Sequence, residues 1–278
     1  MSHSKKTRQP KAGTPQKTEA HRATRRQRVL GTMVILVAGI LVAALVAGGV
    51  LFRDQFWGSS TAGPKTAAIV DQLSLTQPNP SFAEAATATL EQAGYAVDYY
   101  SGEEITVDFY KNLPAHGYDL IIMRVHSGLA RDYGQPTNYV SLFSNEPFSE
   151  TKYAAEKAAG LVGRSSYYDG GAQYFGIVPA FIESSMAGRF DGAKIVLMGC
   201  DGLITDTTAE AFIRKGAKTV VGWSGRVSAT HTDAATEHLL RHLLIDRLTT
   251  TDAVAQTTAE VGPDPEYDST LGVYPSKG

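Results

Sequence analysis

Two apolar segments of the sequence each end in a residue that can take part in nucleophilic catalysis. Residues 120–125 precede His126, and residues 195–198 lead through Gly199 to Cys200, the single cysteine of the chain. A thiol beside an imidazole can attack a carbonyl carbon, because the imidazole takes up the thiol proton and later returns it to the leaving group. His126 and Cys200 are therefore the candidate catalytic dyad of an acyl-transfer reaction.

Glycines flank both candidate catalytic residues. Gly128 follows His126 after one intervening residue, and Gly199 immediately precedes Cys200. Small residues leave room for a scissile peptide, and backbone N–H groups near them can stabilise the charge that develops on the carbonyl oxygen. Gly128 and Gly199 are accordingly the candidate oxyanion positions.

The dyad can form only if the two apolar segments are neighbouring strands of one sheet. Apolar segments alternate with segments of helical periodicity, which predicts a mostly parallel sheet covered by helices on both faces, a three-layer α/β/α sandwich. Parallel neighbours end at the same edge, where the functional loops of such sheets gather. The predicted strands are 65–73, 95–100, 119–125, 194–198 and 218–223, and the predicted helices are 80–93, 106–113, 179–187, 207–215, 230–248 and 251–261.

Two regions carry no clear periodic pattern. Apart from the helix 179–187, the stretch 127–193 is rich in Tyr, Ser and Gly and predicts loops, and the chain after residue 261 predicts irregular structure. Tyr167, Tyr168 and Tyr174 lie in the first of these regions. They either line a substrate groove or pack on the sheet.

A structural role is the alternative for each member of the dyad taken alone. A single cysteine at the end of a strand is usually a small buried hydrophobic residue, and a lone histidine usually makes ordinary polar contacts. The joint placement of His126 and Cys200, each after an apolar strand and each close to a glycine, favours the catalytic interpretation.

A second group of titratable residues lies on the predicted helix 230–248. His231, His238 and His242 share one stripe of that helix at 100° per residue, with Asp246 nearby. Three ligands on one straight helix would span about 16 Å, too far for a single ion, and the glutamate of the H-E-x-x-H motif is absent. We therefore interpret the stripe as a solvated polar face, and we predict neither a metal ligand nor a cofactor.

The segments around His126 and Cys200 resemble the signature of the caspase-like cysteine peptidases, which include caspases, legumains, gingipains, separases and CHAT-domain proteins. In these proteins a His-Gly pair follows one hydrophobic strand, and an Ala-Cys or Gly-Cys pair follows the next. The matching run for the cysteine is residues 198–202, and residues 211–224 resemble the CHAT pattern of a helix, Gly-Ala, a strand and a tryptophan.

The chain departs from this signature at two points. Ser127 separates His126 from Gly128, which puts the oxyanion donor in question, and the 74 residues from His126 to Cys200 require an insertion before the cysteine strand. The resemblance nevertheless implies that His126 and Cys200 are the dyad.

The resemblance also implies a place for the substrate. Trp223 and Ser224 would lie near the strand that pairs with the substrate backbone. Asp201 either attracts a basic side chain of the substrate or is an ordinary solvated loop residue, which is the simpler interpretation.

The N-terminal part of the chain has a different character. Residues 1–28 contain nine Lys and Arg and predict a disordered cytoplasmic arm, and residues 29–52 carry no charge. At about 1.5 Å per residue those 24 residues would extend about 36 Å as a helix, enough to span a lipid bilayer as a single transmembrane anchor. Residues 53–64 predict a linker, and the positive-inside rule places the caspase-like domain, residues 65–278, outside the cytoplasm.

Charge narrows the possible partners. The whole chain has a net charge of −2, but nine of its 26 basic residues and only one of its 28 acidic residues lie in the N-terminal arm. The remainder carries a net charge of −10, which disfavours binding to nucleic acid because the surface repels phosphate. The glycine motifs of nucleotide-binding loops and the G-x-S-x-G motif of serine hydrolases are absent from the sequence.

The sequence thus predicts a membrane-anchored cysteine endopeptidase that acts on a peptide or protein substrate. The alternative is a non-catalytic, membrane-anchored sensor or scaffold that uses the same sheet to bind a peptide or protein partner.

Overall fold

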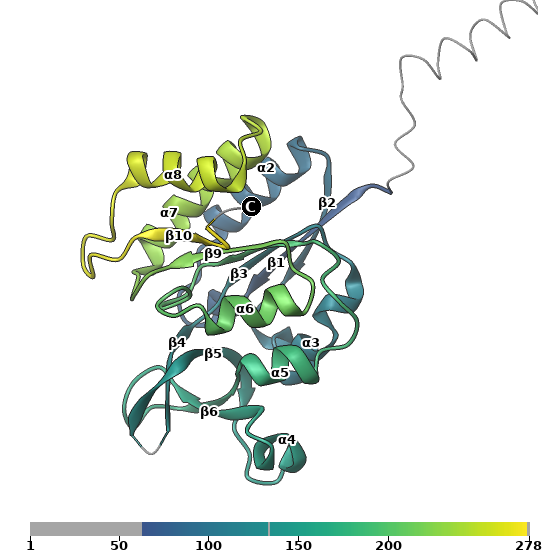
Figure 1. Ribbon diagram of the computed structural model, residues 1–278, viewed down its shortest axis with the longest axis vertical. Helices are drawn as coiled ribbons and strands as arrows, with labels where there is room; N and C mark the ends of the chain where they lie inside the picture. Colours follow the sequence, from purple (N-terminus) through teal and green to yellow (C-terminus); the bar gives the residue numbers. More distant parts are fainter. Residues whose placement is uncertain (1–62, 133, 277–278) are drawn as a thin grey trace, which may run out of the picture. The chain divides into compact units, whose positions relative to one another are not determined.

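Six strands form the main sheet of the protein, in the order β10-β9-β8-β3-β1-β2 (Figure 1). All neighbours in this sheet are parallel except β10, which runs antiparallel to β9. Its strands are β1 (Lys65–Asp71), β2 (Tyr95–Tyr100), β3 (Leu120–Arg124), β8 (Lys194–Leu197), β9 (Thr219–Trp223) and β10 (Leu271–Tyr274). The five predicted strands are therefore present, and β10 is an addition in a segment for which we expected irregular structure.

The computed structural model describes residues 63–132 and 134–276. The predicted cytoplasmic arm, transmembrane helix and nearly all of the linker lie outside these residues. Within the described part of the chain, no helix is both long enough and apolar enough to cross a bilayer.

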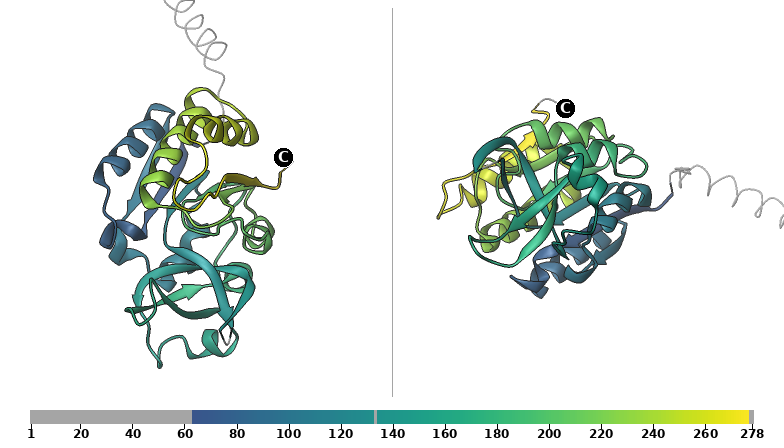
Figure 2. Two further views of the ribbon diagram at one scale, coloured as in Figure 1. Left: turned by 90° about the vertical axis from the view of Figure 1, so that its left-hand side faces the viewer. Right: turned by 90° about the horizontal axis from the view of Figure 1, so that it is seen from below.

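Helices cover both faces of the main sheet, as the predicted three-layer arrangement requires (Figures 1 and 2). Alternate residues of a strand face opposite sides, so Ala67 and Ile69 of β1 join one core while Ala68 and Val70 join the other. The helices of the first core are α2 (Pro80–Gln92), α7 (Ala229–Leu240) and α8 (Thr250–Val261). Those of the second core are α3 (Val107–Asn112), α5 (Pro179–Ser184) and α6 (Thr207–Arg214).

A second sheet occupies the region for which the sequence predicted loops. It is antiparallel, with the order β4-β5-β7-β6, and lies at the foot of Figure 1. Its strands are β4 (Ser127–Asp132), β5 (Gln135–Pro147), β6 (Val162–Ser166) and β7 (Gln173–Ile177), and the short helix α4 (Ala154–Ala158) lies between β5 and β6. Only one face needs to be apolar in such a sheet, so residues such as Val140, Leu142 and Phe175 enter the core without forming an apolar run.

The prediction of one continuous α-helix over residues 230–248 is wrong in its second half. The α-helix α7 ends at Leu240 and continues as a π-helical turn over Arg241–Ile245. Such turns are rare and are frequently found at functional sites.

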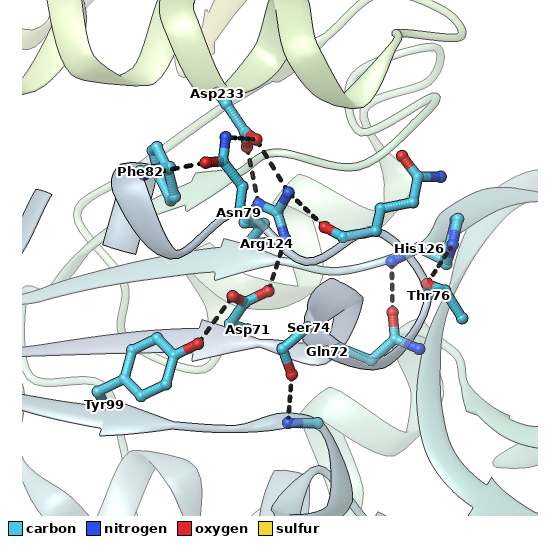
Figure 3. A network of polar contacts seen from close by, with 12 residues as sticks. Asp71, Gln72, Ser74, Thr76, Asn79, Phe82, Tyr99, Arg124, His126 and Asp233 are labelled. Atoms are coloured by element: carbon cyan, nitrogen blue, oxygen red, sulfur yellow. Dashed lines mark hydrogen bonds and ion pairs between the residues drawn. The ribbon is translucent and has the colours of Figure 1, made fainter. Parts of the chain in front are cut away.

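A buried guanidinium joins the ends of several elements on one side of the main sheet (Figure 3). Arg124, at the end of β3, is 1% exposed. Its Nε and Nη2 donate to both carboxylate oxygens of Asp233 on α7, at 2.7 and 2.9 Å, and its Nη1 donates to Asp71 at the end of β1, at 2.9 Å. Asp71 also accepts from the Tyr99 hydroxyl, and Asp233 accepts from the Asn79 amide.

The same network fixes the start of α2. The Asn79 side chain accepts a hydrogen bond from the backbone N–H of Phe82 as an N-cap, while Pro80 occupies the first helical position. Nη2 of Arg124 donates to the Gln77 carbonyl oxygen at 2.9 Å. The ends of β1 and β3, the beginning of α2 and the middle of α7 are thus held by one cation.

We predict that Arg124→Met lowers the free energy of unfolding by about 3–5 kcal/mol, because it leaves two buried carboxylates without their partner. The matched control is Arg214→Met, which removes an exposed guanidinium that pairs with Glu183 and Glu210. Loss of such a surface pair costs about 1 kcal/mol or less. Urea unfolding followed by tryptophan fluorescence measures both values, and equal losses in the two variants would contradict this account of the network.

Candidate active site

The two candidate catalytic residues follow neighbouring strands of the main sheet. β3 and β8 are parallel, and the register pairs Leu120 with Lys194 and Met123 with Leu197. Each pair is separated by the same number of residues as His126 and Cys200. The long separation therefore equals the offset between the two paired strands, so His126 and Cys200 each lie three residues beyond the last register pair, Met123 and Leu197.

A hydroxyl clamp ties the two strand ends together. The Ser127 hydroxyl donates to the Cys200 carbonyl oxygen at 2.7 Å. A Cβ atom on Gly199 would collide with the Ser127 hydroxyl and with the Val125 carbonyl oxygen, so the close approach of the two segments requires glycine at this position. Ser127, which departs from the His-Gly pattern, thus joins the segment of the histidine to that of the cysteine.

The thiol of Cys200 is half-buried and lies against the segment that follows β9. It contacts the backbone of Val227, with its sulfur 3.5 Å from the amide nitrogen and 3.6 Å from the carbonyl oxygen. Burial raises the pKa of the Cys200 thiol, and the backbone hydrogen bond from Val227 only partly opposes that rise. Near neutral pH the group is therefore a thiol and not a thiolate.

His126 is held by groups from three parts of the chain. Its backbone N–H donates to the Gln72 side chain at 2.8 Å, and its Nε2 lies 3.4 Å from the Thr76 hydroxyl (Figure 3). The ring packs on Tyr167, with 4.4 Å between the ring centroids. Burial and the positive charge of Arg124 lower the pKa of His126 to about 4, so the imidazole is neutral at pH 7.

The Cys200 thiol and the His126 imidazole, the two candidate catalytic groups, are therefore both uncharged near neutral pH. Within residues 63–132 and 134–276, the thiol of Cys200 makes its hydrogen bonds to Val227, and the ring of His126 makes its contact with Thr76. Hydrogen bonds between catalytic groups are often long or poorly aligned before substrate binds. In this arrangement His126 can serve as a general base at the moment of attack, whereas a resting thiolate–imidazolium pair is disfavoured.

A buried amide network supports the histidine, and sequence analysis missed it. Gln72 follows β1 in a 3-10 turn and is fully buried, and its amide nitrogen donates to Asn145 at 2.6 Å and to the Tyr167 hydroxyl at 2.8 Å. Gln72 thereby links the main sheet to the second sheet directly beneath the His126 backbone. The only signal in the sequence was a polar residue inside an apolar run, which does not reveal its partners.

The three tyrosines singled out in the sequence have different environments. Tyr167 packs on His126 and on Tyr174, whose ring centroid lies 5.1 Å away. Tyr168 is 70% exposed. Tyr167 thus belongs to the surroundings of the candidate dyad, and Tyr168 presents its ring to solvent.

Gly128 and Asp201 make backbone contacts at the same edge. Gly128 pairs with Ser141 in the β4–β5 ladder, so it belongs to a strand and not to the turn that we expected. Asp201 has a positive φ of 61°, and its carboxylate accepts from the backbone N–H of Leu129 at 3.1 Å. The oxyanion role of Gly128 and Gly199 and the substrate role of Asp201 stay predictions.

The candidate substrate-binding residues Trp223 and Ser224 are engaged within the protein. Trp223 is 1% exposed and donates from its indole nitrogen to the Thr232 hydroxyl at 2.9 Å. β10 pairs with β9 as far as Trp223, and the backbone N–H of Ser224 donates to the Thr270 carbonyl oxygen. Pairing of a substrate backbone with this edge would require the segment around Thr270 to move.

The three histidines of the predicted helix 230–248 lie in two different environments. The ring of His231 lies 5.3 Å from that of Trp223, whereas His238 and His242 both contact Glu260 of α8. His242 is buried, so the expected solvated polar face is wrong at this position. His238, His242 and Glu260 form the candidate metal-ligand group of the described residues.

Comparisons with known proteins give likeness at the level of structure and not of sequence. No protein-family model matches the chain, and no curated protein matches it. The chain is similar to a solved structure of the Arg specific cysteine proteinase gingipain R (RGPB), with a TM-score of 0.40 and 10% sequence identity. The match covers 70% of this chain and 42% of that one, so this chain spans less than half of its length.

We predict that iodoacetamide modifies Cys200 more slowly at pH 7 than it modifies a short unfolded cysteine peptide, because burial raises the thiol pKa and lowers the thiolate fraction. The rate should keep rising above pH 9. Since Cys200 is the only cysteine, intact-mass measurement reports this site alone, and the urea-unfolded chain provides the internal control. A rate at pH 7 above that of the peptide would show an activated thiolate and contradict the neutral pair.

Proposed function

We propose that the protein is a cysteine peptidase in which Cys200 attacks the peptide carbonyl and His126 is the general base. One observation carries the proposal. His126 and Cys200 follow neighbouring parallel strands whose last register pair is Met123 with Leu197, and the Ser127–Cys200 hydrogen bond ties the two segments together. The three-layer α/β/α fold supports the proposal only by offering the edge at which such sites form.

The proposed reaction begins from the neutral pair. As the Cys200 sulfur bonds to the carbonyl carbon, its proton passes to the imidazole of His126, and the carbonyl oxygen gains negative charge. Backbone N–H groups at Gly128 and Gly199 are the proposed donors to that oxygen. His126 then gives its proton to the leaving amine, and in the second half it activates the water that hydrolyses the thioester.

Two features of the site prepare His126 for this role. Its depressed pKa keeps the ring unprotonated at neutral pH, and the Gln72 hydrogen bond fixes its backbone. The contact of Nε2 with the Thr76 hydroxyl is long, at 3.4 Å, so this hydrogen bond is weak and leaves Nε2 available to take up a proton.

We further propose that residues 29–52 anchor this domain in a lipid bilayer, with the N-terminal arm in the cytoplasm and the catalytic domain outside it. The proposal rests on the 24 consecutive uncharged residues and on the basic arm that precedes them. The substrate would then be a peptide or protein on the extracytoplasmic side.

One observation favours the alternative of a non-catalytic module that binds a peptide or protein. The Cys200 thiol hydrogen-bonds to the Val227 backbone and has a raised pKa, as a structural cysteine does. A binding module would keep the same sheet edge without turning over its ligand.

We predict that Cys200→Ala abolishes peptide hydrolysis and that His126→Ala lowers turnover about 10²–10⁴-fold, the range for loss of a positioned acid–base group. The matched control is His116→Ala, an exposed histidine that stacks on Tyr118 away from the dyad. The full chain in detergent is assayed against a peptide library, and cleavage is detected by mass spectrometry.

The comparison among these variants decides the question. If His126→Ala cleaves as fast as His116→Ala, then His126 is not the base and the proposal fails. If the unaltered chain cleaves no peptide but retains selected library members, the binding module is the correct function.

A further inference from the structure

Three side chains that can bind a metal ion lie close together on α7, on the π-helical turn after it and on α8. None of them belongs to the candidate dyad. These are Nδ1 of His238 on α7, Nε2 of His242 in the π-helical turn and the carboxylate of Glu260 on α8, and their ligand atoms all lie within 4.8 Å of one another. Oε2 of Glu260 is 2.6 Å from Nδ1 of His238 and 3.1 Å from Nε2 of His242. Ligands of a tetrahedral zinc ion lie about 3.3 Å apart, so small side-chain movements would admit the ion.

The sequence alone does not predict this arrangement. Three histidines on one straight helix cannot share an ion, and His231 indeed packs elsewhere, on Trp223. The two that remain are four residues apart and share one helical face, as in many zinc sites. The third group, Glu260, comes from the neighbouring helix, so only the packing of α8 on α7 reveals it.

A second carboxylate orients the buried histidine. Nδ1 of His242 lies 2.8 Å from the Asp246 carboxylate, and the side chain of His242 is 4% exposed. A proton on Nδ1 leaves the lone pair of Nε2 directed at Glu260, and two acceptors cannot face each other without a proton or a cation between them. Histidine ligands of metals commonly donate their other N–H to a carboxylate in this way.

We propose that His238, His242 and Glu260 bind a divalent transition-metal ion of the zinc class, with Asp246 as the positioning residue for His242. Two imidazoles and one carboxylate suit Zn²⁺, and a site with three protein ligands leaves a fourth position for water or an exogenous ligand. His238 lines a shallow surface hollow of about 380 Å³ with Ala85, Thr89 and Ile245, so the group is open to solvent on that side.

Arg241 competes with the ion for this position. Its Nη2 lies 2.8 Å from Oε2 of Glu260 and 3.3 Å from Nε2 of His242, so the guanidinium supplies the positive charge between them. The side chain is 49% exposed and can turn toward solvent when a metal ion enters. Removal of this competitor should therefore strengthen metal binding.

The experiment measures Zn²⁺ binding by the full chain after treatment with a chelator. All proteins carry Cys200→Ala, which removes the thiol that could bind Zn²⁺ independently. Isothermal calorimetry should show one saturable Zn²⁺ site, which is lost in His238→Ala and in His242→Ala. His116→Ala is the matched control and should retain the Zn²⁺ site, because His116 lies in the short turn after α3, where it stacks on Tyr118.

Two further variants distinguish a metal site from an ion-pair cluster. Asp246→Asn should weaken binding about 10- to 100-fold while leaving one ion bound at saturation, as expected for loss of a group that orients a ligand. Arg241→Gln should bind Zn²⁺ more tightly than its parent. The proposal is overturned if the parent shows no saturable site, or if the His238→Ala and His242→Ala variants bind Zn²⁺ as the parent does. Neither result bears on peptide cleavage, since the dyad uses none of these residues.

Discussion

Arg124 lies inside the protein between two carboxylates, and four elements, β1, β3, α2 and α7, converge on its guanidinium. A buried cation is costly to desolvate, and it is tolerated only where good geometry and several hydrogen bonds compensate. Arg124 satisfies this condition through its bidentate contact with Asp233, its contact with Asp71 and its donation to the Gln77 carbonyl oxygen. These contacts fix where β1 ends, where α2 begins and how α7 lies across the sheet, because each partner must reach the same small group.

The same charge also shapes the candidate active site. Arg124 precedes His126 by two residues, and its positive charge disfavours a second cation on the imidazole. Burial acts in the same direction on His126, and burial separately keeps the Cys200 thiol protonated. The candidate dyad is consequently a pair of neutral groups that follow two neighbouring strands, with Ser127 and Gly199 allowing those strand ends to approach closely.

The parts of the fold that the sequence predicted are those in which local pattern and tertiary environment agree. β3 and β8 are buried on both faces, so all their positions except the terminal Arg124 and Lys194 are apolar and the strands are visible in the sequence. The second sheet was missed because buried serines, Ser141, Ser144 and Ser165 among them, interrupt its apolar positions while hydrogen-bonding across the sheet.

The residues of the candidate site likewise divide into those that the sequence could reveal and those that it could not. His126 and Cys200 could be found because each follows a visible strand. Gln72, Asn145 and Glu260 could not, since each acts through a partner that is remote in sequence and is brought near only by packing. A polar residue in an apolar run indicates that a partner exists, but it does not identify the partner.

In the proposed peptidase, the Cys200 thiol and the His126 imidazole are both neutral before the reaction, and His126 is the general base. The most direct test is the pH dependence of kcat/KM for the full chain with the best substrate from the peptide library. The account predicts that kcat/KM is flat from neutral pH down to the acid limb and falls only as the pH approaches the pKa of His126, about 4. A fall centred near 6.5, the ordinary value for histidine, would contradict it.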